Sequence, residues 1–342
     1  MAKDIDYETA IAELRRARRI ALTTHTKPDG DALGSIAALR RWLLAQGKTV
    51  EVILPSPAPS KYAFLDPDGV WKTVGRDVDF RTFPAPDLVC ILDTCTWLQL
   101  SGVEPLLHYS CVPILAIDHH RTQDALADFL LADPDAAATA VLIHRLFVKT
   151  SAALDSETAA YLFAALASDT DWFRLPSVDA EILRLAASLV EAGAQPSAIH
   201  ENLFLNDDLS KVRLLGRAIE TLRTALDGRV TLMRLTQALF RESGADVGDT
   251  ENLINECMKV RGTQVGLLLI ESDKDEVRVS LRAKPPIDVL SVAEHFGGGG
   301  HRRAAGARLK GSLDQVEATV LAAVAGALGR PESAWPPDAR PL

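Results

Sequence analysis

Residues 20–35 read IALTTHTKPDGDALGS. The apolar run at 20–24 predicts a strand that is buried on both faces, because it does not alternate with polar residues. Pro28 and Gly30 exclude regular structure in the positions that follow. Beyond them, apolar residues at spacings of three and four predict a helix over 31–46 with one buried face. A strand, a short loop and a helix in this order are typical of a parallel α/β sheet.

The loop of this unit carries His25, Asp29 and Asp31. Since the loop has no regular structure, it can fold these three side chains around one point. The alternative is an Asx turn with a helix cap, which would use one aspartate and leave the other aspartate and the histidine without a role. The helix after the loop favours anions near its N-terminus, and Gly34 would let a backbone or a ligand come close.

Further apolar runs predict the rest of the sheet. Three more strands are expected, at residues 50–54, 88–92 and 112–117. Asp93 directly follows the second of these runs, and Asp118, His119 and His120 follow the third. Ligands of open parallel sheets bind beyond the carboxyl ends of the strands, so these side chains are expected at one edge. A single aspartate after a strand is more often a turn or cap residue, but three strands end in this way, and caps do not account for the three histidines among these residues.

A fourth carboxylate is expected from the helical region. The apolar stretch at 159–167 is followed by Asp169 and Asp171. An acidic residue at the C-terminal end of a helix opposes the helix dipole, so a cation is expected to neutralise Asp169, with Asp171 as its competitor. Carboxylates with fewer imidazoles suit Mn²⁺ or Mg²⁺ better than structural zinc, and six ligands suit two ions that share a carboxylate. The predicted metal ligands are His25, Asp29, Asp31, Asp93, His119 and Asp169.

A second α/β unit is expected in the last third of the chain. Its predicted strands are 229–235, 265–271 and 277–281, and its predicted helices are 251–260, 289–296 and 313–328. The expected division of the chain is a catalytic domain at 1–206, a linker helix at 207–228, a substrate-binding domain at 229–330 and a disordered tail at 331–342.

Composition and charge limit the class of protein. The chain has 342 residues, of which 47% are hydrophobic and 24% charged, as in ordinary globular proteins. Its 37 basic and 46 acidic residues give a net charge of −9, which argues against binding long duplex nucleic acid and allows a short anionic ligand. The cysteines have no paired metal spacing and predict reduced thiols: Cys90, Cys95, Cys111 and Cys257. An acidic start and no apolar stretch of about 20 residues predict a cytoplasmic protein without a membrane segment.

These motifs together resemble the four motifs of the DHH phosphoesterase superfamily, which includes RecJ-type exonucleases, family II pyrophosphatases, exopolyphosphatases and nano-RNases. The resemblance implies two Mn²⁺ ions, or Mg²⁺, in two ligand groups that share Asp93: His25, Asp29 and Asp93, and Asp31, Asp93, His119 and Asp169. It further implies that His120 faces the substrate phosphate and that Asp118 orients a histidine ring. The implied catalytic residues are therefore Asp93, Asp118 and His120.

The second unit resembles the DHH-associated C-terminal domain. The sequence FGGGGH at 296–301 is followed by AAG at 304–306. Four glycines let backbone N–H groups approach a phosphate, whereas the alternative is a flexible glycine linker. The resemblance implies substrate contacts from Arg261, Arg282, Gly299, Gly300 and His301. The implied fold is α/β, with an N-terminal parallel-sheet DHH domain, a smaller C-terminal α/β domain and the active site in the cleft between them.

Among its relatives, the chain most resembles NrnA-type nano-RNases, because it has neither the oligonucleotide-binding domain of RecJ nor the membrane segments of cyclic-dinucleotide phosphodiesterases. The implied function is hydrolysis of short oligoribonucleotides and of 3′-phosphoadenosine 5′-phosphate. Alternatives are a cyclic- or linear-dinucleotide phosphodiesterase without membrane segments and a catalytically silent nucleotide-binding protein. The expected partner is a short RNA or a nucleoside bisphosphate, with no long duplex and no membrane, and a homodimer is left open.

Overall fold

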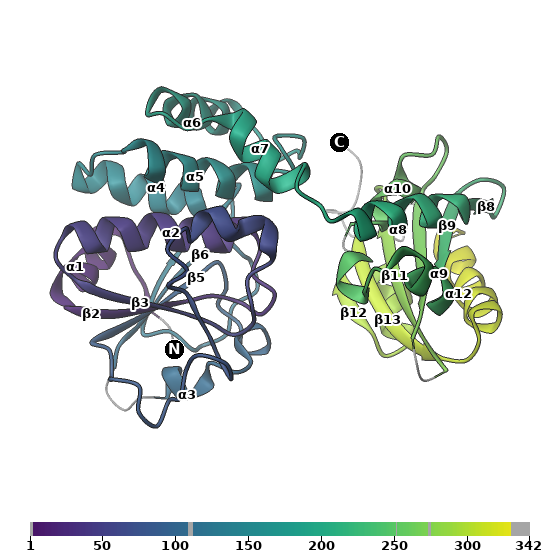
Figure 1. The fold of residues 1–342 in the computed structure, drawn as a ribbon, viewed down its shortest axis with the longest axis horizontal. Coiled ribbons are helices and arrows are strands. Elements are labelled where there is room, and N and C mark those ends of the chain that lie inside the picture. The colour runs from purple at the N-terminus through teal and green to yellow at the C-terminus, as the bar shows by residue number, and fades with distance from the viewer. Residues whose placement is uncertain (1–2, 109–111, 251, 273–274, 330–342) are drawn as a thin grey trace. The chain divides into compact units, whose positions relative to one another are not determined.

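The computed structural model describes residues 3–108, 112–250, 252–272 and 275–329. The chain divides into two compact units, the first ending at Asn206 and the second beginning at Asp207 (Figure 1). Cys111 and the tail expected at 331–342 lie outside the described residues.

The first unit is built on a seven-stranded sheet. All its neighbouring strands run parallel, in the order β1-β7-β6-β5-β2-β3-β4. The strands are β1 (Lys3–Asp4), β2 (Arg19–Thr23), β3 (Thr49–Leu54), β4 (Lys72–Thr73), β5 (Leu88–Leu92), β6 (Ile114–Asp118) and β7 (Phe129–Ala132). The predicted parallel α/β class of this unit is confirmed, although β1, β4 and β7 were not expected.

Helices cover both faces of this sheet. They are α1 (Tyr7–Arg16), α2 (Gly30–Ala45), α3 (Glu104–Leu107), α4 (Thr139–Thr150), α5 (Ser156–Asp169), α6 (Ala180–Glu191) and α7 (Pro196–Phe204), with 3₁₀ turns η1 (Ser60–Leu65) and η2 (Trp97–Leu100). In Figure 1, α2 lies against the sheet, α4 and α5 lie over α2, and α6 and α7 lie outside them. The helix α3 lies on the opposite side of the sheet.

The central strand β5 explains the unbroken apolar runs. Leu88, Cys90 and Leu92 pack into the core that contains α2 and α5. Val89 and Ile91 point to the opposite face and pack into a second core, which contains α3. Because alternate side chains of a strand face opposite sides of the sheet, a strand covered on both sides must be apolar at every position.

The second unit contains a six-stranded mixed sheet in the order β12-β13-β11-β10-β9-β8. Its strands are β8 (Arg223–Ala225), β9 (Val230–Leu235), β10 (Val265–Glu271), β11 (Glu276–Ala283), β12 (Gly299–His301) and β13 (Ala304–Lys310). Its helices are α8 (Leu209–Glu220), α9 (Gln237–Ser243), α10 (Ile254–Met258), α11 (Leu290–His295) and α12 (Leu313–Leu328), with the 3₁₀ turn η3 (Val247–Thr250). Apolar side chains of α12 pack on one face of the sheet and those of α8 and α10 on the other.

The structure corrects the expected linker helix at 207–228. The helix α8 ends at Glu220, and the expectation of helix beyond it is wrong, because β8 then pairs antiparallel with β9. Leu214 and Ala218 of α8 are fully buried against residues of the second unit. The segment is therefore part of the folded second unit.

Two features bear on the class of protein. Cys90, Cys95 and Cys257 are buried free thiols, and burial raises the pKa of Cys95 and of Cys257 to about 11. Across the described ranges, no helix is long and apolar enough to cross a bilayer. The three described cysteines are free thiols, as the sequence predicts.

Candidate metal centre

The start of α2 fixes the loop that follows β2. Asp29 caps this helix, because its Oδ1 accepts hydrogen bonds from the N–H groups of Asp31 (3.0 Å) and Ala32 (3.1 Å). The helix therefore begins at Gly30, one residue earlier than expected. Helix capping, the alternative role considered for this loop, is therefore one role of Asp29. The residues around it indicate a second role.

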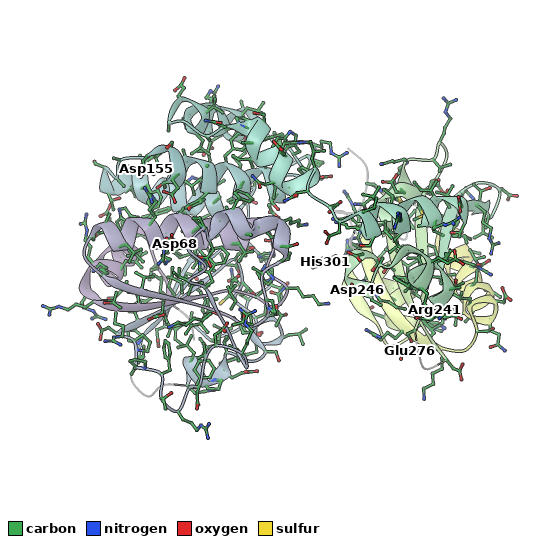
Figure 2. All side chains as sticks on the ribbon, in the orientation of Figure 1. Asp68, Asp155, Arg241, Asp246, Glu276 and His301 are labelled. Atoms are coloured by element: carbon green, nitrogen blue, oxygen red, sulfur yellow. The ribbon has the colours of Figure 1, made fainter. Side chains whose placement is uncertain are left out.

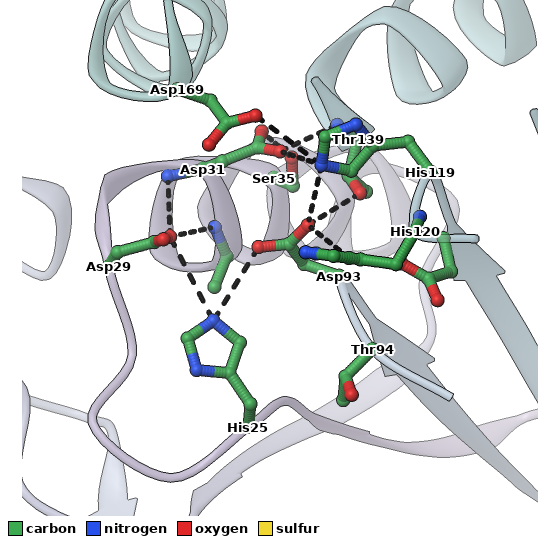
Figure 3. A network of polar contacts seen from close by, with 12 residues as sticks. His25, Asp29, Asp31, Ser35, Asp93, Thr94, His119, His120, Thr139 and Asp169 are labelled. Atoms are coloured by element: carbon green, nitrogen blue, oxygen red, sulfur yellow. Dashed lines mark hydrogen bonds and ion pairs between the residues drawn. The ribbon is translucent and has the colours of Figure 1, made fainter. Parts of the chain in front are cut away.

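The expected side chains converge at the carboxyl edge of the sheet (Figure 3). Three overlapping groups place candidate ligand atoms within 4.8 Å of one another: His25, Asp29 and Asp93; Asp31, His119 and Asp169; and Asp93, His119 and His120. All six predicted metal ligands belong to these groups. Asp171 belongs to none of these groups and instead forms an ion pair with Arg174.

The first group surrounds the Nε2 atom of His25. This atom lies 3.5 Å from Asp93 Oδ2 and 3.9 Å from Asp29 Oδ1. Two donor atoms that each lie about 2.1 Å from one ion are about 3–4 Å apart, whereas a direct hydrogen bond would bring them to about 2.9 Å. These separations therefore fit a shared cation better than direct contact.

The second group surrounds the Nε2 atom of His119. This atom lies 3.3 Å from Asp169 Oδ2 and 3.9 Å from Asp31 Oδ2. It also lies 3.5 Å from Oδ1 of Asp93, the carboxylate whose other oxygen faces His25. The two oxygens of Asp93 thus point to different groups, as a bridging carboxylate would.

Backbone carbonyls set the orientation of both imidazoles. Nδ1 of His25 lies 3.0 Å from the carbonyl oxygen of Thr26, and Nδ1 of His119 lies 3.1 Å from that of Ala136. A carbonyl can only accept, so each Nδ1 carries the proton and each Nε2 presents its lone pair to the carboxylates. This is the arrangement by which proteins hold histidine ligands of metals.

Electrostatics also favour a cation at this edge. Burial, together with neighbouring carboxylates, raises the pKa of Asp31 and of Asp93 well above the usual range. Burial likewise raises the pKa of Asp169. A cation among these carboxylates would offset the burial and the mutual repulsion. The residues present therefore fit a metal centre of oxygen ligands with fewer nitrogen ligands, the preference of Mn²⁺ or Mg²⁺.

His120 belongs to the third group, with Asp93 and His119, and its side chain is 44% exposed. Its Nδ1 is 2.8 Å from Oδ1 of the fully buried Asp118, and 3.8 Å from Asp93 Oδ1. The hydrogen bond to Asp118 raises the pKa of His120 to about 9. Asp118 thus orients the ring of His120, which leaves the opposite nitrogen free to meet a ligand.

Five of the six predicted ligands lie in a segment that matches a known domain, and a second known domain follows it. Residues 19–166 match the DHH family N-terminal domain, and residues 228–328 match the DHHA1 domain. The chain therefore carries a DHH domain followed by a DHHA1 domain. The first unit is hereafter the DHH unit and the second the DHHA1 unit.

The chain is similar over most of its length to named bacterial proteins. It is 29% identical to "bifunctional oligoribonuclease and PAP phosphatase NrnA" of Thermus thermophilus, covering 94% of both chains. It is 24% identical to the protein of the same name from Bacillus subtilis, covering 85% of this chain and 89% of that one. An exopolyphosphatase-related protein from Bacteroides fragilis has the same fold, with a TM-score of 0.84 at 22% identity over 94% and 95% of the two chains.

The DHHA1 unit places two of its predicted substrate residues in one row of the sheet. Across β12, β13 and β11, His301 pairs with Ala304, and Ala304 pairs with Arg282. Directly opposed residues point to the same face, and two strand spacings separate the outer ones by about 9–10 Å. Arg261 is exposed in the turn just before β10, the next strand of the sheet. Figure 2 shows His301 at the surface of this unit.

The second half of the glycine run forms a strand, so the alternative of a flexible linker is wrong. Gly299–His301 form β12, which pairs with β13. A Cβ at Gly300 would lie 2.5 Å from the carbonyl oxygen of Ala304, and one at Gly298 would lie 2.2 Å from that of Gly306. Glycine is therefore required for the close approach of the two strands. Among the described residues β12 is an edge strand, with one row of backbone N–H groups left for a ligand.

The residues that hold the ligands in place were not predicted from the sequence. Ser35 donates to Asp31 Oδ1 at 3.3 Å, and Thr139 donates to both Asp31 and Asp93. The carbonyl oxygen of Ala136 fixes His119. The last two reach the site because β7 is a parallel neighbour of β6, so its carboxyl end lies at the same edge. Since β7 was not expected from the sequence, no signal pointed to them.

Proposed function

We propose that this protein is a two-metal phosphoesterase that hydrolyses short oligoribonucleotides and 3′-phosphoadenosine 5′-phosphate. The observation that carries the proposal is the Asp93 carboxylate, whose oxygens lie 3.5 Å from His25 Nε2 and 3.5 Å from His119 Nε2. A carboxylate shared by two ligand groups is what a pair of ions about 3.5–4 Å apart requires.

We assign both groups to Mn²⁺, with Mg²⁺ as the alternative, because oxygen ligands dominate and the histidines supply the rest. When bound, such ions activate a water molecule and stabilise the charge that builds on a phosphoryl group in the transition state. The chain itself holds four carboxylates and two imidazoles in place around the two ion positions.

His120 is proposed to contact the substrate phosphate. It is the most exposed histidine of the three at this edge, and Asp118 fixes its ring by a 2.8 Å hydrogen bond. A ring held in this way donates its remaining N–H without a loss of orientational freedom on binding. Asp118 would act through His120 and would not touch the substrate.

The DHHA1 unit is proposed to bind a second part of the substrate. Arg282 is half-buried, and within the described part of the chain its guanidinium makes one long hydrogen bond, to the carbonyl of Leu281 at 3.4 Å. This guanidinium, His301 in the same row, and the free edge of β12 at Gly299 and Gly300 are suited to a phosphate. Arg261 would extend this cationic surface.

The names of similar proteins and the net charge of this chain both favour a short substrate. The two similar bacterial proteins are named for oligoribonuclease and PAP phosphatase activities. The net charge of −9 does not favour a long duplex, which needs a broad basic face. A silent binding protein is the less favoured function, since pseudoenzymes lose metal ligands and all six predicted ligands are brought together here.

The test is an assay of the purified full chain with a panel of substrates, namely ribodinucleotides, a longer single-stranded RNA, cyclic di-AMP and 3′-phosphoadenosine 5′-phosphate. With Mn²⁺ we expect release of mononucleotides from the dinucleotides and of phosphate from the bisphosphate, with little activity on the longer RNA. Chelation with EDTA should abolish both activities, and Mn²⁺ should restore them. Full activity in metal-free buffer would contradict the two-metal proposal, and activity confined to cyclic di-AMP would replace the substrate assignment.

A further inference from the structure

The first turn of α4, the helix that follows β7, contacts the metal centre although it supplies none of the predicted ligands. The helix α4 begins at Thr139, beside the carboxylate of Asp31. The N–H of Thr139 donates to Asp31 Oδ2 at 2.5 Å, and the N–H of Ala140 donates to Asp31 Oδ1 at 3.0 Å. The first turn of α4 thus satisfies two of its own unpaired donors with one carboxylate.

The side chain of Thr139 makes a second contact. Its hydroxyl donates to Asp93 Oδ1 at 2.9 Å (Figure 3). This oxygen is the one that faces His119, whereas Oδ2 of Asp93 faces His25. Thr139 therefore bonds the shared carboxylate through its hydroxyl and a carboxylate of one group through its backbone.

These contacts lie away from water. Thr139 and Asp31 are completely buried, and Asp93 is 2% exposed. A hydrogen bond to a buried carboxylate cannot be replaced by solvent when its donor is removed, so the carboxylate would lose both its partner and its orientation. The rotation of Asp93 about its side-chain bonds decides whether its two oxygens face two ion positions or one.

We propose that Thr139 is a positioning residue that couples the two metal positions by holding Asp93 between them. The inference rests on the proposed two-metal function and adds a residue that touches neither substrate nor metal. The hydroxyl is the part that matters, because the backbone donors to Asp31 stay in place whatever the side chain at this position.

The variants separate the hydroxyl from the packing of the side chain. Thr139→Val has nearly the same shape and lacks the hydroxyl, whereas Thr139→Ser keeps the hydroxyl and lacks the methyl group. Thr150→Val is the matched control, since Thr150 ends the same helix and, among the residues that the structure describes, donates only to the carbonyls of Leu146 and Phe147. Thermal unfolding of each metal-free variant reports any general loss of structure.

The primary measurement is a calorimetric titration of the full chain with Mn²⁺ alone. For the wild type we expect two bound ions. For Thr139→Val we expect Mn²⁺ affinity at one or both positions to fall about tenfold or more, the usual effect of losing an outer-shell partner. Thr139→Ser should bind nearly as the wild type does, and Thr150→Val should match the wild type. Turnover of a ribodinucleotide should fall in parallel for Thr139→Val and recover in Thr139→Ser.

Two results would overturn the inference, and they are distinguishable. Unchanged Mn²⁺ affinity and turnover in Thr139→Val, beside a wild type that binds two ions, would make the residue a packing element only. A wild type that binds fewer than two ions yet is fully active would overturn the two-metal function and this inference with it. If Thr139→Val does not fold, Thr139→Ala replaces it, and equal losses in the Ala and Ser variants would contradict a role for the hydroxyl.

Discussion

Asp93 has a left-handed backbone, with a φ of 63°. Few residues other than glycine adopt this conformation, although aspartate and asparagine tolerate it best. The N–H of Asp93 still donates to the carbonyl of Ile117 at 2.9 Å, so pairing with β6 holds the backbone in this state. The turn then directs the carboxylate across the edge of the sheet.

Asparagine is therefore the informative replacement for Asp93. Asp93→Asn keeps the shape and tolerates the backbone, but it removes a charge that both ion positions share. We expect turnover of a dinucleotide to fall by at least about 10³-fold, the scale on which preorganised charge stabilisation is lost. Asp29→Asn removes a ligand of one group only and should cost less.

The measurement is single-turnover hydrolysis at saturating Mn²⁺ for both variants, with thermal unfolding as a control for structure. Near-normal turnover of Asp93→Asn would reduce Asp93 to a turn residue. A larger loss in Asp29→Asn than in Asp93→Asn would contradict the bridging role.

Residues of the site differ in how far the sequence could predict them. His25, Asp93 and His119 follow apolar runs, and the topology of a parallel sheet then requires them to meet. Thr139 does not follow a predicted strand, so the sequence does not indicate its role. That role depends on which strand lies beside β6. The carbonyl of Ala136 has no sequence signal, since any amino acid at that position would supply the same oxygen.

At the scale of elements, the packing of α2 against α5 sets the distance between two ligands. Asp31 lies in the first turn of α2, and Asp169 is the last residue of α5. Gly34 lies at the contact, where a Cβ would be 2.6 Å from the carbonyl oxygen of Tyr161 and 2.8 Å from the Cβ of Ala165. The two helices can approach this closely only because Gly34 has no side chain.

Gly34→Ala should therefore destabilise the protein, although alanine is the better helix former. Forcing a methyl group into this contact is expected to cost about 1–3 kcal/mol of unfolding free energy. Gly326→Ala on α12 is the opposite control, because a Cβ at this position would meet no neighbouring atom within 4 Å, and the substitution should stabilise by about 0.5–1 kcal/mol. Urea unfolding followed by far-UV circular dichroism gives both values, and an unchanged or higher midpoint for Gly34→Ala would contradict the packing argument.

Core elements with a clear apolar pattern were predictable, and elements without one were not. Leu88–Leu92 was expected as the strand it forms, and Leu313–Leu328 as the helix it forms, because each has a clear apolar pattern. The strand β13 has the sequence AAGARLK, which has little intrinsic preference for a strand. Pairing with β11 decides its structure, and a single sequence does not reveal that partner. The strand β8 was expected as helix for the same reason.

At the scale of the whole molecule, the two units are expected to have separate tasks. A change in the DHHA1 unit should affect substrates that are long enough to reach it and should spare a small chromogenic one. His301→Ala removes a charge-assisted contact of about 1.5–3 kcal/mol. We expect the ratio of kcat/KM for a dinucleotide to that for bis(p-nitrophenyl) phosphate to fall about tenfold or more.

His295→Ala is the matched control for this ratio, since His295 is an exposed histidine of α11 outside the glycine motif. Its ratio should equal that of the wild type. Equal losses on both substrates in His301→Ala would place this histidine in the chemistry or in the stability of the fold, and would contradict its assignment to substrate binding.

The order of strands in the DHH unit has a consequence for solubility. The strand β5, with the sequence LVCIL, is the middle one of seven, and the described residues end the sheet in two-residue strands on both sides. Apolar segments of this kind, without proline or charge, stack into cross-β aggregates when they are exposed. Short edges offer a second molecule few free N–H and C=O groups. Unfolded or partly folded chains, in which β5 is not yet paired, are therefore expected to aggregate. The folded protein is expected to stay in solution at high protein concentration.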